Sequence, residues 1–322
     1  MLKTTLRFLC ISVICVFFAD IEITTLDPWI ELGRMFRGAL TPDPSALWDF
    51  RGAILNTLVF ALCGITLGIA AGAPLSLLFH YRPVRITCAL IRAVHEIFWA
   101  FLFLPIVGLN PVCGVLAIAV PYAGIFAKVF AEIIQEADAR PASALPGNTD
   151  DLTRFAYGVL PVVFQSLRNY SSYRFECALR SSAILGFIGL PTLGFHLETA
   201  FRESLYCEAA TLLYAFYFLI FSLRWWLRPR VVPIWVAGAF LLLAKDVSFR
   251  VENIFRFAYE NLPWPMRRSG FLEESGAVDW VTSGTGQWLW DLMRGQGLRG
   301  IGDTVVLTQI VLGATGLFAA AT

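Results

Sequence analysis

The sequence predicts an all-α protein that crosses a membrane several times as a helical bundle. Of its 322 residues, 57% are hydrophobic and only 15% are charged, whereas about 25% of the residues in a soluble domain are charged. The apolar residues also form long runs, and about 20 residues of helix are enough to cross a hydrocarbon core of about 30 Å. Together these two observations predict a polytopic membrane protein with about eight transmembrane helices. The net charge of +1 gives no general attraction for nucleic acid.

Eight apolar segments are the candidate spans. The first and seventh are short, and the fifth carries charges and is long enough to extend beyond the bilayer. The first segment lacks a small-x-small cleavage pattern before Asp20, which favours a first span; a cleaved signal peptide stays open as the alternative. The predicted spans are 3–19, 53–79, 87–109, 112–134, 160–190, 207–225, 231–246 and 302–322.

The positions of arginine orient these spans. Cytoplasmic loops carry an excess of Lys and Arg, and a cytoplasmic N-terminus places the arginine-containing loops 80–85, 135–159 and 224–230 on that side. We therefore expect a cytoplasmic N-terminus. The outside segments would then be 20–52, 108–111, 191–206 and 247–301.

A polar segment interrupts the apolar runs between Gln135 and Arg154. A segment of this kind between two spans lies in water, where a soluble partner can perform mechanical work on it. This pattern predicts a driven transporter. The sequence has no Gly-x-x-x-x-Gly-Lys-Ser/Thr motif, so we expect ATP hydrolysis on another polypeptide and no catalytic residue or bound cofactor in this chain.

Metal chemistry is not predicted either. The three histidines are scattered, and the seven cysteines form no Cys-x-x-Cys pair and lie mostly inside apolar runs. We interpret these cysteines as small apolar residues within helices.

Ionisable residues inside the predicted spans are the candidate pathway or gate, because an unpaired charge there is costly. Lys128 and Glu132 are four residues apart and can pair along one helical face. Two interpretations of the fifth span stay open: a polar pathway facing an aqueous cavity, or a Glu176–Arg180 ion pair that holds helices together. The candidate pathway residues are Glu96, Glu132, Tyr173, Arg174, Glu176 and Arg180.

Two sets of glycines also carry predictions. The first set has four-residue spacing and predicts a smooth face for close helix packing. The second ends the helix of the fifth span, either as a bend near a pathway or as a simple turn. The sets are Gly64, Gly68 and Gly72, and Gly186, Gly189 and Gly194.

The chain begins to repeat itself near its end. The run Asn56–Phe60 is similar to Asp303–Leu307, and a tryptophan-bearing amphipathic stretch precedes each run, from Trp29 and from Trp288. Internal duplication is common in transporters. We therefore predict a first module in residues 1–228, with its core at 50–225, and the start of an incomplete second repeat in 229–322, with an external segment at 247–301. The alternative is that two membrane helices share a simple Thr-Val pattern.

Three motifs between residues 50 and 225 resemble the permeases of the phosphonate ABC-transporter family, which are type I importer permeases. The first is similar to the family's proline-glutamate-tryptophan-alanine run, with His95 in place of the proline. The motifs are residues 92–103, then residues 123–132, and finally Leu160-Pro161 followed by Tyr173-Arg174-Phe175-Glu176 and residues 180–186.

The resemblance implies a permease of the bacterial inner membrane with a type I importer fold. It implies cytoplasmic nucleotide-binding ATPase subunits carrying ATP and Mg²⁺, a periplasmic solute-binding protein that delivers a phosphonate or related phosphorus oxyanion, and a second permease module as homodimer or fused repeat. Membrane lipid is the remaining partner, and no nucleic acid is expected. The implied ATPase-coupling residues are Ser143, Ala144, Leu145, Gly147, Asn148, Leu160 and Pro161.

The chain departs from the family in the coupling loop. The usual Glu-Ala-Ala followed by glycine reads Ala-Ser-Ala-Leu-Pro-Gly-Asn from Ala142 to Asn148. Pro146 would break a helix interior, and the polar residues that follow it can cap a new helix from about Leu152. Two alternative functions therefore stay open: a secondary carrier or membrane enzyme that uses intramembrane carboxylates, and a truncated or degenerate permease with impaired coupling.

Overall fold

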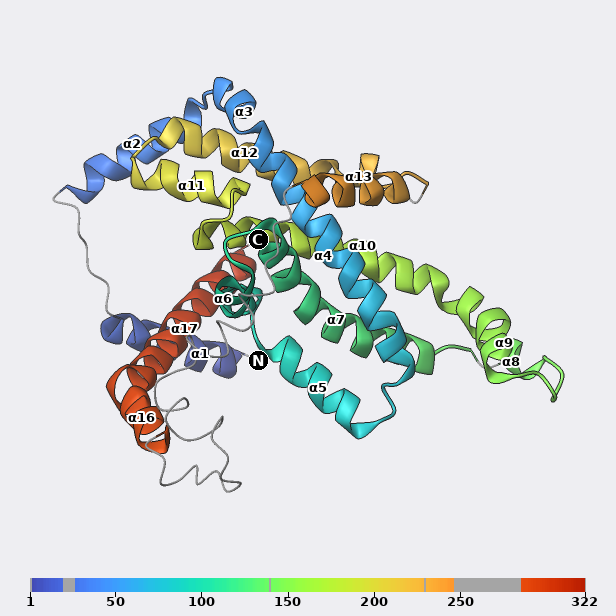
Figure 1. Cartoon of the computed structure of the whole chain (residues 1–322). Coiled ribbons are helices and arrows are strands. Elements are labelled where there is room, and N and C mark those ends of the chain that lie inside the picture. Colours follow the sequence, from blue (N-terminus) through green and yellow to red (C-terminus); the bar gives the residue numbers. More distant parts are fainter. Residues whose placement is uncertain (1, 20–26, 139, 229, 246–284, 322) are drawn as a thin grey trace, which may run out of the picture. The chain divides into compact units, whose positions relative to one another are not determined.

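The computed structural model describes residues 2–19, 27–138, 140–228, 230–245 and 285–321 (Figure 1). Regular structure in these residues is helical throughout, with no strand among them. The chain divides into two compact units, one formed by Leu32–Phe257 and the other by Met1–Glu31 with Ala258–Thr322. The all-α fold class that the composition predicts is therefore confirmed for the described residues.

The larger unit contains most of the helices. The helices between residues 27 and 245 are α2 (Pro28–Leu40), α3 (Ser45–Asp49), α4 (Arg51–Leu77), α5 (Arg82–Ala93), α6 (Glu96–Val107), α7 (Pro111–Gln135), α8 (Arg140–Ser143), α9 (Asp151–Arg154), the π-helix η1 (Phe155–Val159), α10 (Leu160–Ile184), the 3₁₀ helix η2 (Leu185–Ile188), α11 (Leu193–Arg202), α12 (Tyr206–Trp226) and α13 (Val232–Lys245). The smaller unit contains α1 (Leu2–Phe18), α16 (Thr285–Leu292), the π-helix η4 (Met293–Gly297) and α17 (Leu298–Ala321).

Among the described residues, four helices are long and apolar enough to cross a membrane: Arg51–Leu77, Pro111–Gln135, Tyr206–Leu223 and Leu289–Leu317. Two bent helix pairs raise the number to six if each pair forms one span. The shorter apolar helices Leu6–Phe18 and Val232–Lys245 correspond to the first and seventh predicted spans. Each of the eight predicted segments thus has a helical counterpart. Only four of these counterparts, or six if each bent pair is one span, are long and apolar enough to cross a membrane.

The third predicted span is not one straight helix. Residues 87–109 were expected to form it, yet α5 and α6 meet there at 93°. Val94 and His95 have extended backbone conformations (ψ 127° and 150°), so the helix cannot continue through them. His95 caps α6, because its Nδ1 accepts a hydrogen bond from the backbone N–H of Ile97 at 3.4 Å.

Close packing of α4 on α7 forms the centre of the larger unit. The glycines at 64, 68 and 72 face α7, and a Cβ added to each of them would lie 2.7 Å from Ile118 Cγ2, 3.0 Å from Tyr122 Cβ and 2.6 Å from Phe126 Cβ, respectively. This confirms the smooth face that the four-residue spacing predicts, since small residues let two helix backbones approach closely.

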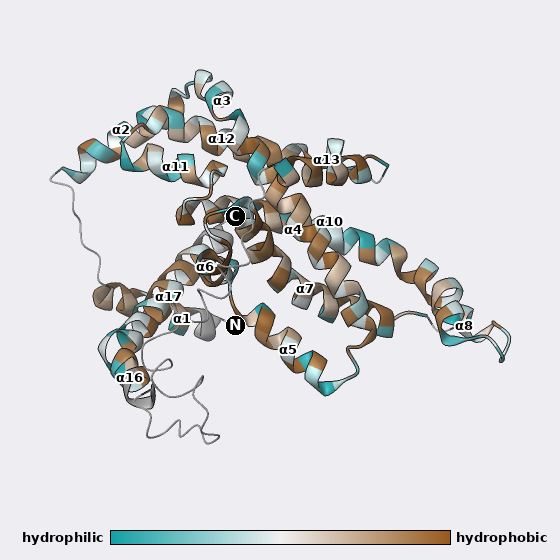
Figure 2. Cartoon of the chain, in the orientation of Figure 1, coloured by the Kyte–Doolittle hydropathy of each residue, from teal (hydrophilic) through white to brown (hydrophobic). Residues whose placement is uncertain are grey.

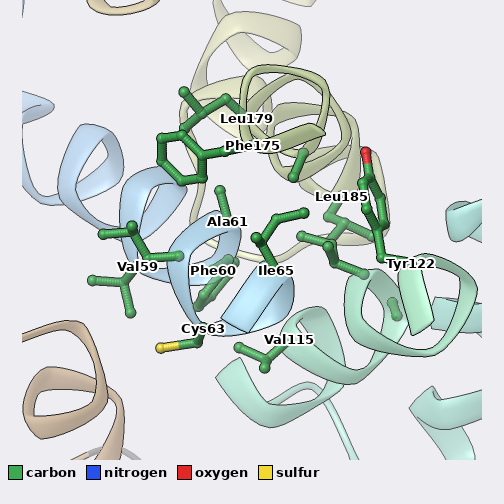
Figure 3. Packing of buried hydrophobic residues seen from close by; sticks show 14 of the residues in the cluster. Val59, Phe60, Ala61, Cys63, Ile65, Val115, Tyr122, Phe175, Leu179 and Leu185 are labelled. Atoms are coloured by element: carbon green, nitrogen blue, oxygen red, sulfur yellow. The ribbon is translucent and has the colours of Figure 1, made fainter. Parts of the chain in front are cut away.

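The hydrophobic core surrounds this contact and extends to α10. Figure 3 shows side chains from α4, such as Phe60 and Ile65, beside Val115 and Tyr122 of α7 and Phe175 of α10. All five residues are at most 5% exposed. The core therefore joins α4 to α7 and α10, the two helices that carry most of the candidate pathway residues.

The second glycine set forms a tight turn between α10 and α11. Gly189 has φ +94°, a left-handed conformation that glycine adopts without steric cost. A Cβ on Gly194 would meet the carbonyl group of Ala183, so the start of α11 packs directly on the end of α10. The fifth predicted span, 160–190, accordingly ends in a 52° bend between Asp151–Ile188 and Leu193–Arg202.

Packing of α1 on α17 stabilises the smaller unit. Ser12 is 6% exposed and donates to the backbone oxygen of Gln309 at 3.0 Å, and a Cβ on Gly313 would lie 2.6 Å from Ser12 Cβ. The predicted second repeat in 229–322 stays a prediction. Most of its external segment falls within 246–284, outside the described residues.

Candidate functional site

The polar interruption folds into a short helical elbow, residues 140–159, ahead of α10. Just before the elbow, the carboxylate of Asp138 accepts a hydrogen bond from the backbone N–H of Arg140 at 3.0 Å. The same carboxylate forms an ion pair with the Arg140 guanidinium, with 2.7 Å between Asp138 Oδ2 and Arg140 Nη2. Figure 2 shows mainly hydrophilic and neutral colours around α8, whereas α4 and α7 are mostly brown. The elbow is therefore the water-compatible part of this stretch of chain.

A cap and a proline set the bounds of the helices in the elbow. The helix α8 ends at Ser143, three residues before Pro146, and α9 begins at Asp151. Asp150 is the N-cap of α9, and its carboxylate accepts from the N–H of Thr153 at 3.1 Å. Hydrogen bonds from the side chain and backbone of Thr153 hold the pKa of Asp150 below its ordinary value. The predicted break at Pro146 and new helix near Leu152 both agree with these bounds.

The elbow is closed by contact between its two arms. Gly158 is buried in η1, and a Cβ there would lie 2.6 Å from Ala142 Cα of α8. Two large apolar side chains point away from this contact, because Leu152 and Tyr157 are each 74% exposed. The arrangement offers an apolar surface on a polar support.

The predicted coupling residues lie in and just after this elbow. Leu145 and Leu160 are half-buried, and Leu160 begins α10. The remaining predicted residues are exposed: Ser143, Ala144, Gly147, Asn148 and Pro161. Their role in coupling stays a prediction.

Glu96 links two helices. It begins α6, its side chain is 15% exposed, and its Oε1 accepts a hydrogen bond from Ser181 Oγ of α10 at 3.2 Å. Its other oxygen lies 3.4 Å from His95 Nε2. The carboxylate therefore fixes the corner after α5 to the middle of the bundle.

Arg174 of α10 binds an aromatic side chain of its own helix. Its Nε donates to Tyr170 Oη at 2.7 Å, and its guanidinium lies 5.2 Å from the centroid of that ring. The Tyr170 ring in turn contacts Phe126 and Phe130 of α7. Arg174 thus lies on the α7 side of α10. Tyr173, the other predicted aromatic, is 58% exposed.

Glu176 and Arg180 lie on another face of α10. They form an ion pair with 2.8 Å between Arg180 Nη2 and Glu176 Oε1, and their side chains are 39% and 60% exposed. The pair lines a pocket of about 420 Å³ together with Ser172 and with Tyr217 of α12. An exposed pair of this kind contributes at most about 1 kcal/mol to stability. Its place in the wall of a pocket therefore distinguishes it more than its contribution to helix stability does.

Lys128 and Glu132 form the predicted pair along α7. Lys128 Nζ and Glu132 Oε1 are 3.1 Å apart, with side chains 35% and 48% exposed. Of the six predicted pathway residues, Glu176 pairs with Arg180, and the Arg174 guanidinium lies 5.8 Å from the centroid of the Tyr173 ring. Glu96 and Glu132 bind residues outside this set. No single site contains all six.

Some polar residues at the helix junctions carried no predicted role. Ser182 donates to the backbone oxygen of Thr57 at 2.8 Å, and Thr57 Oγ1 accepts from the N–H of Leu193 at 2.9 Å. These two buried side chains join α4, α10 and the start of α11. Ser181 and Tyr170 were also missed, and a search four residues from each charged position on α10 would have found Tyr170 beside Arg174.

Within the described ranges, no group of three or more His, Cys, Asp or Glu side chains is placed to hold a metal ion.

Comparisons with known proteins identify transport permeases as relatives. The chain is 29% identical over 213 residues to the phosphate-import permease protein PhnE of Mycolicibacterium smegmatis, a match to 62% of this chain and 40% of that protein. It is 32% identical over 146 residues to HtxE of Stutzerimonas stutzeri, a protein named as a phosphite transport system permease, covering 45% of this chain and 56% of HtxE.

A shorter relative decides the family. PhnE2 of Escherichia coli K12, named as a permease protein of a cryptic phosphonate transport system, is 32% identical over 88 residues. The match covers 27% of this chain and 72% of PhnE2. The chain belongs to the phosphonate transport permease family.

The phosphonate permease family accounts for the predicted motifs and the multi-pass membrane character. This family member spans 40% and 56% of the lengths of PhnE and HtxE, respectively. No family model matches the chain. Among solved structures, a crystal structure of an amino acid ABC transporter with histidines aligns with 61% of this chain and 91% of its own, at 17% identity and a TM-score of 0.44.

Proposed function

We propose that this protein is the membrane-spanning permease subunit of an ABC importer for a phosphorus oxyanion. The proposal rests mainly on similarity to a phosphate-import permease along 62% of the chain. The names of these relatives refer to phosphate, phosphite and phosphonate. These solutes share a tetrahedral phosphorus centre with anionic oxygens, which suits arginine donors.

The elbow is the proposed receiver of mechanical work. Its exposed Leu152 and Tyr157 offer an apolar surface, and its folded shape agrees with a helix that inserts into a groove on a cytoplasmic ATPase. Gly158 against Ala142 favours transmission of force, because the two arms of the elbow move together when they are in contact. Since α10 follows directly, a push on the elbow would tilt that helix.

The other components of the importer are proposed to be separate proteins or a second permease module. ATP and Mg²⁺ would bind the ATPase subunits, and a periplasmic solute-binding protein would deliver the oxyanion to the outer face of a bacterial inner membrane. The N-terminus would lie in the cytoplasm. A second permease module would complete the pathway, as a homodimer or as a fused repeat.

Crosslinking tests the docking of the ATPase. In a background in which serine replaces the exposed Cys10 and Cys207, Leu152→Cys would be purified with a co-expressed ATPase from the same operon and treated with a short thiol crosslinker. We expect a product that contains both proteins and whose yield changes when ATP is added. Thr41→Cys is the matched control, since it is exposed and is predicted to lie on the opposite side of the membrane.

Uptake into proteoliposomes tests the transport itself. We expect labelled phosphate, phosphite or a simple phosphonate to enter only when the ATPase, the solute-binding protein and ATP are all present. Uptake that continues without ATP but stops when a proton gradient collapses would instead support the secondary-carrier alternative. A crosslink without uptake of any of these solutes would leave the docking proposal standing and overturn the substrate class.

A further inference from the structure

The helix α2 has an apolar face that no described part of its unit covers. Leu32, Phe36 and Leu40 follow one another at four-residue spacing and therefore lie on one side of the helix. Their side chains are 55%, 66% and 67% exposed. These three residues are named here the apolar stripe.

The opposite side of α2 is the side attached to the rest of the unit. Gly38 is buried, and a Cβ added to it would lie 2.7 Å from the carbonyl carbon of Tyr206, the first residue of α12. Tyr214 Oη donates to the backbone oxygen of Ala39 at 2.7 Å. Because residues two apart on a helix point in nearly opposite directions, these contacts direct Phe36 and Leu40 away from the protein.

The helix α2 is attached to the protein near the starts of two candidate membrane spans, α4 and α12. The helix α12 begins at Tyr206, and α4 begins at Arg51, shortly after α2 and α3. Trp48 is 72% exposed beside the start of α4, with the guanidinium of Arg51 4.5 Å from its ring centroid. Tryptophan and arginine at the end of a span are typical of the membrane–water interface.

The helix α2 is itself too short and too polar to cross the membrane. Its 13 residues extend about 20 Å at 1.5 Å per residue, against about 30 Å of hydrocarbon. It also carries the exposed Arg37 beside the apolar stripe. A short helix with an apolar face and basic residues beside that face is suited to lie in the interface plane.

We infer that α2 is an interfacial helix whose apolar stripe lies on membrane lipid, at the boundary between headgroups and acyl chains beside the starts of α4 and α12. Lipid is favoured over a protein partner because α2 is attached at the start of α12 and lies shortly before α4, two spans that the same bilayer must surround. The helix would then fix the depth of this end of the bundle. This inference is independent of the transported solute.

Depth-dependent quenching tests the inference in the full chain. A fluorescent amino acid replaces Phe36, and the protein is reconstituted in phosphatidylcholine vesicles that carry a nitroxide either on the headgroup or near the end of the acyl chain. We expect severalfold stronger quenching by the headgroup nitroxide than by the deep one, and little quenching by aqueous iodide. The same label at Leu40 is the second variant, in case the first does not fold.

The same label at Leu152 is the matched control. This leucine is as exposed as the stripe residues, and we expect iodide to quench it and lipid nitroxides to leave it unchanged. Iodide quenching of the stripe labels equal to that at Leu152 would overturn the inference. Quenching that is strongest with the deep nitroxide would also overturn the inference, because it indicates a segment buried in the membrane. Protection from both lipid and iodide would also overturn it, since it indicates a second copy or a soluble protein on the stripe.

Discussion

Of the three glycines of α4 that face α7, Gly72 would bring an added Cβ nearest to the α7 backbone. A Cβ at this position would lie 2.6 Å from Phe126 Cβ and 2.8 Å from the backbone oxygen of Ala123. The second of these atoms belongs to the helix backbone and cannot rotate away. A methyl group here must therefore push the two helices apart.

We predict that Gly72→Ala destabilises the protein. Overpacking costs about 1–3 kcal/mol, which exceeds the gain of about 1 kcal/mol that alanine brings to a helix interior. The melting temperature in detergent should fall by several degrees. Gly52→Ala is the control on the same helix, because a Cβ there would have no neighbour within 4 Å. A melting temperature for Gly72→Ala equal to or above that of Gly52→Ala would contradict the packing described for α4 and α7.

The hydroxyl group of Ser181 joins α10 to Glu96 of α6. Ser181→Ala removes the donor that holds the carboxylate of Glu96, a charge-assisted bond of about 1.5–3 kcal/mol. We expect a lower melting temperature for Ser181→Ala. The same change at Ser171 should have little effect, since its hydroxyl bonds only the backbone of its own helix, at Leu167. Equal losses in the two variants would show that the link from α6 to α10 contributes nothing.

Individual residues were predictable from the sequence where one helix alone determines their neighbours. The spacing of Gly64, Gly68 and Gly72 and the pairing of Lys128 with Glu132 follow from helix geometry. The role of Thr57 does not, because its contacts come from Ser182 and Leu193, more than a hundred residues away. Tertiary packing decides such contacts, and one sequence carries no direct signal of them.

At the level of elements, the elbow depends on the cap of α9. We predict that Asp150→Ala raises hydrogen exchange at the Thr153 amide and makes the elbow more sensitive to protease, since it removes the acceptor of that N–H. Asp150→Asn should keep most of the protection, because asparagine is an equally good N-cap. Unchanged exchange in the alanine variant would contradict the assigned cap.

The pH dependence of the same cap has a definite sign. The pKa of Asp150 is lowered in the folded elbow, so the contribution of its carboxylate is present above the unfolded pKa of about 4 and is lost as pH falls through the lower folded value. Exchange at Thr153, corrected for its intrinsic rate, should therefore rise at low pH in the native protein. It should stay nearly constant in Asp150→Asn, and a parallel rise in both proteins would contradict the assignment.

The elements were predictable where composition changes and much less so where it does not. Pro146 and Asp150 indicate a break and a cap, and both occur in the structure. The corner between α5 and α6 lies inside one apolar run, so hydropathy predicted a single span over 87–109. Its local signs are the polar residues Arg92, His95 and Glu96.

At the level of the whole molecule, the predicted orientation can be tested by labelling intact cells. Leu152→Cys in the elbow and Thr41→Cys after α2 are both exposed and are predicted to face opposite sides of the membrane. A membrane-impermeant thiol reagent should label Thr41→Cys directly and Leu152→Cys only after permeabilisation, in a background without Cys10 and Cys207. Direct labelling of Leu152→Cys would place the elbow outside and remove the proposed contact with a cytoplasmic ATPase.

The fold class of the whole chain followed from its composition, because a chain with 15% charged residues cannot cover its surface with water-compatible groups. The order of the spans followed from hydropathy. Which spans pack together did not, since lipid and protein are equally apolar surroundings for a leucine. The candidate pathway shows the same limit: the pairs within one helix could be expected from their spacing, but the bond between Glu96 and Ser181, which joins two helices, required the structure.

The corner at Val94–His95 has a mechanical consequence. Trp99 Nε1 donates to the carbonyl oxygen of Ile91 at 3.1 Å across the corner, and the His95 ring binds the N–H of Ile97. These two hydrogen bonds make the corner resist bending, because straightening it would break both of them. In the proposed transport cycle, α5 and α6 should therefore move together as one rigid unit, and the bending must occur at other joints.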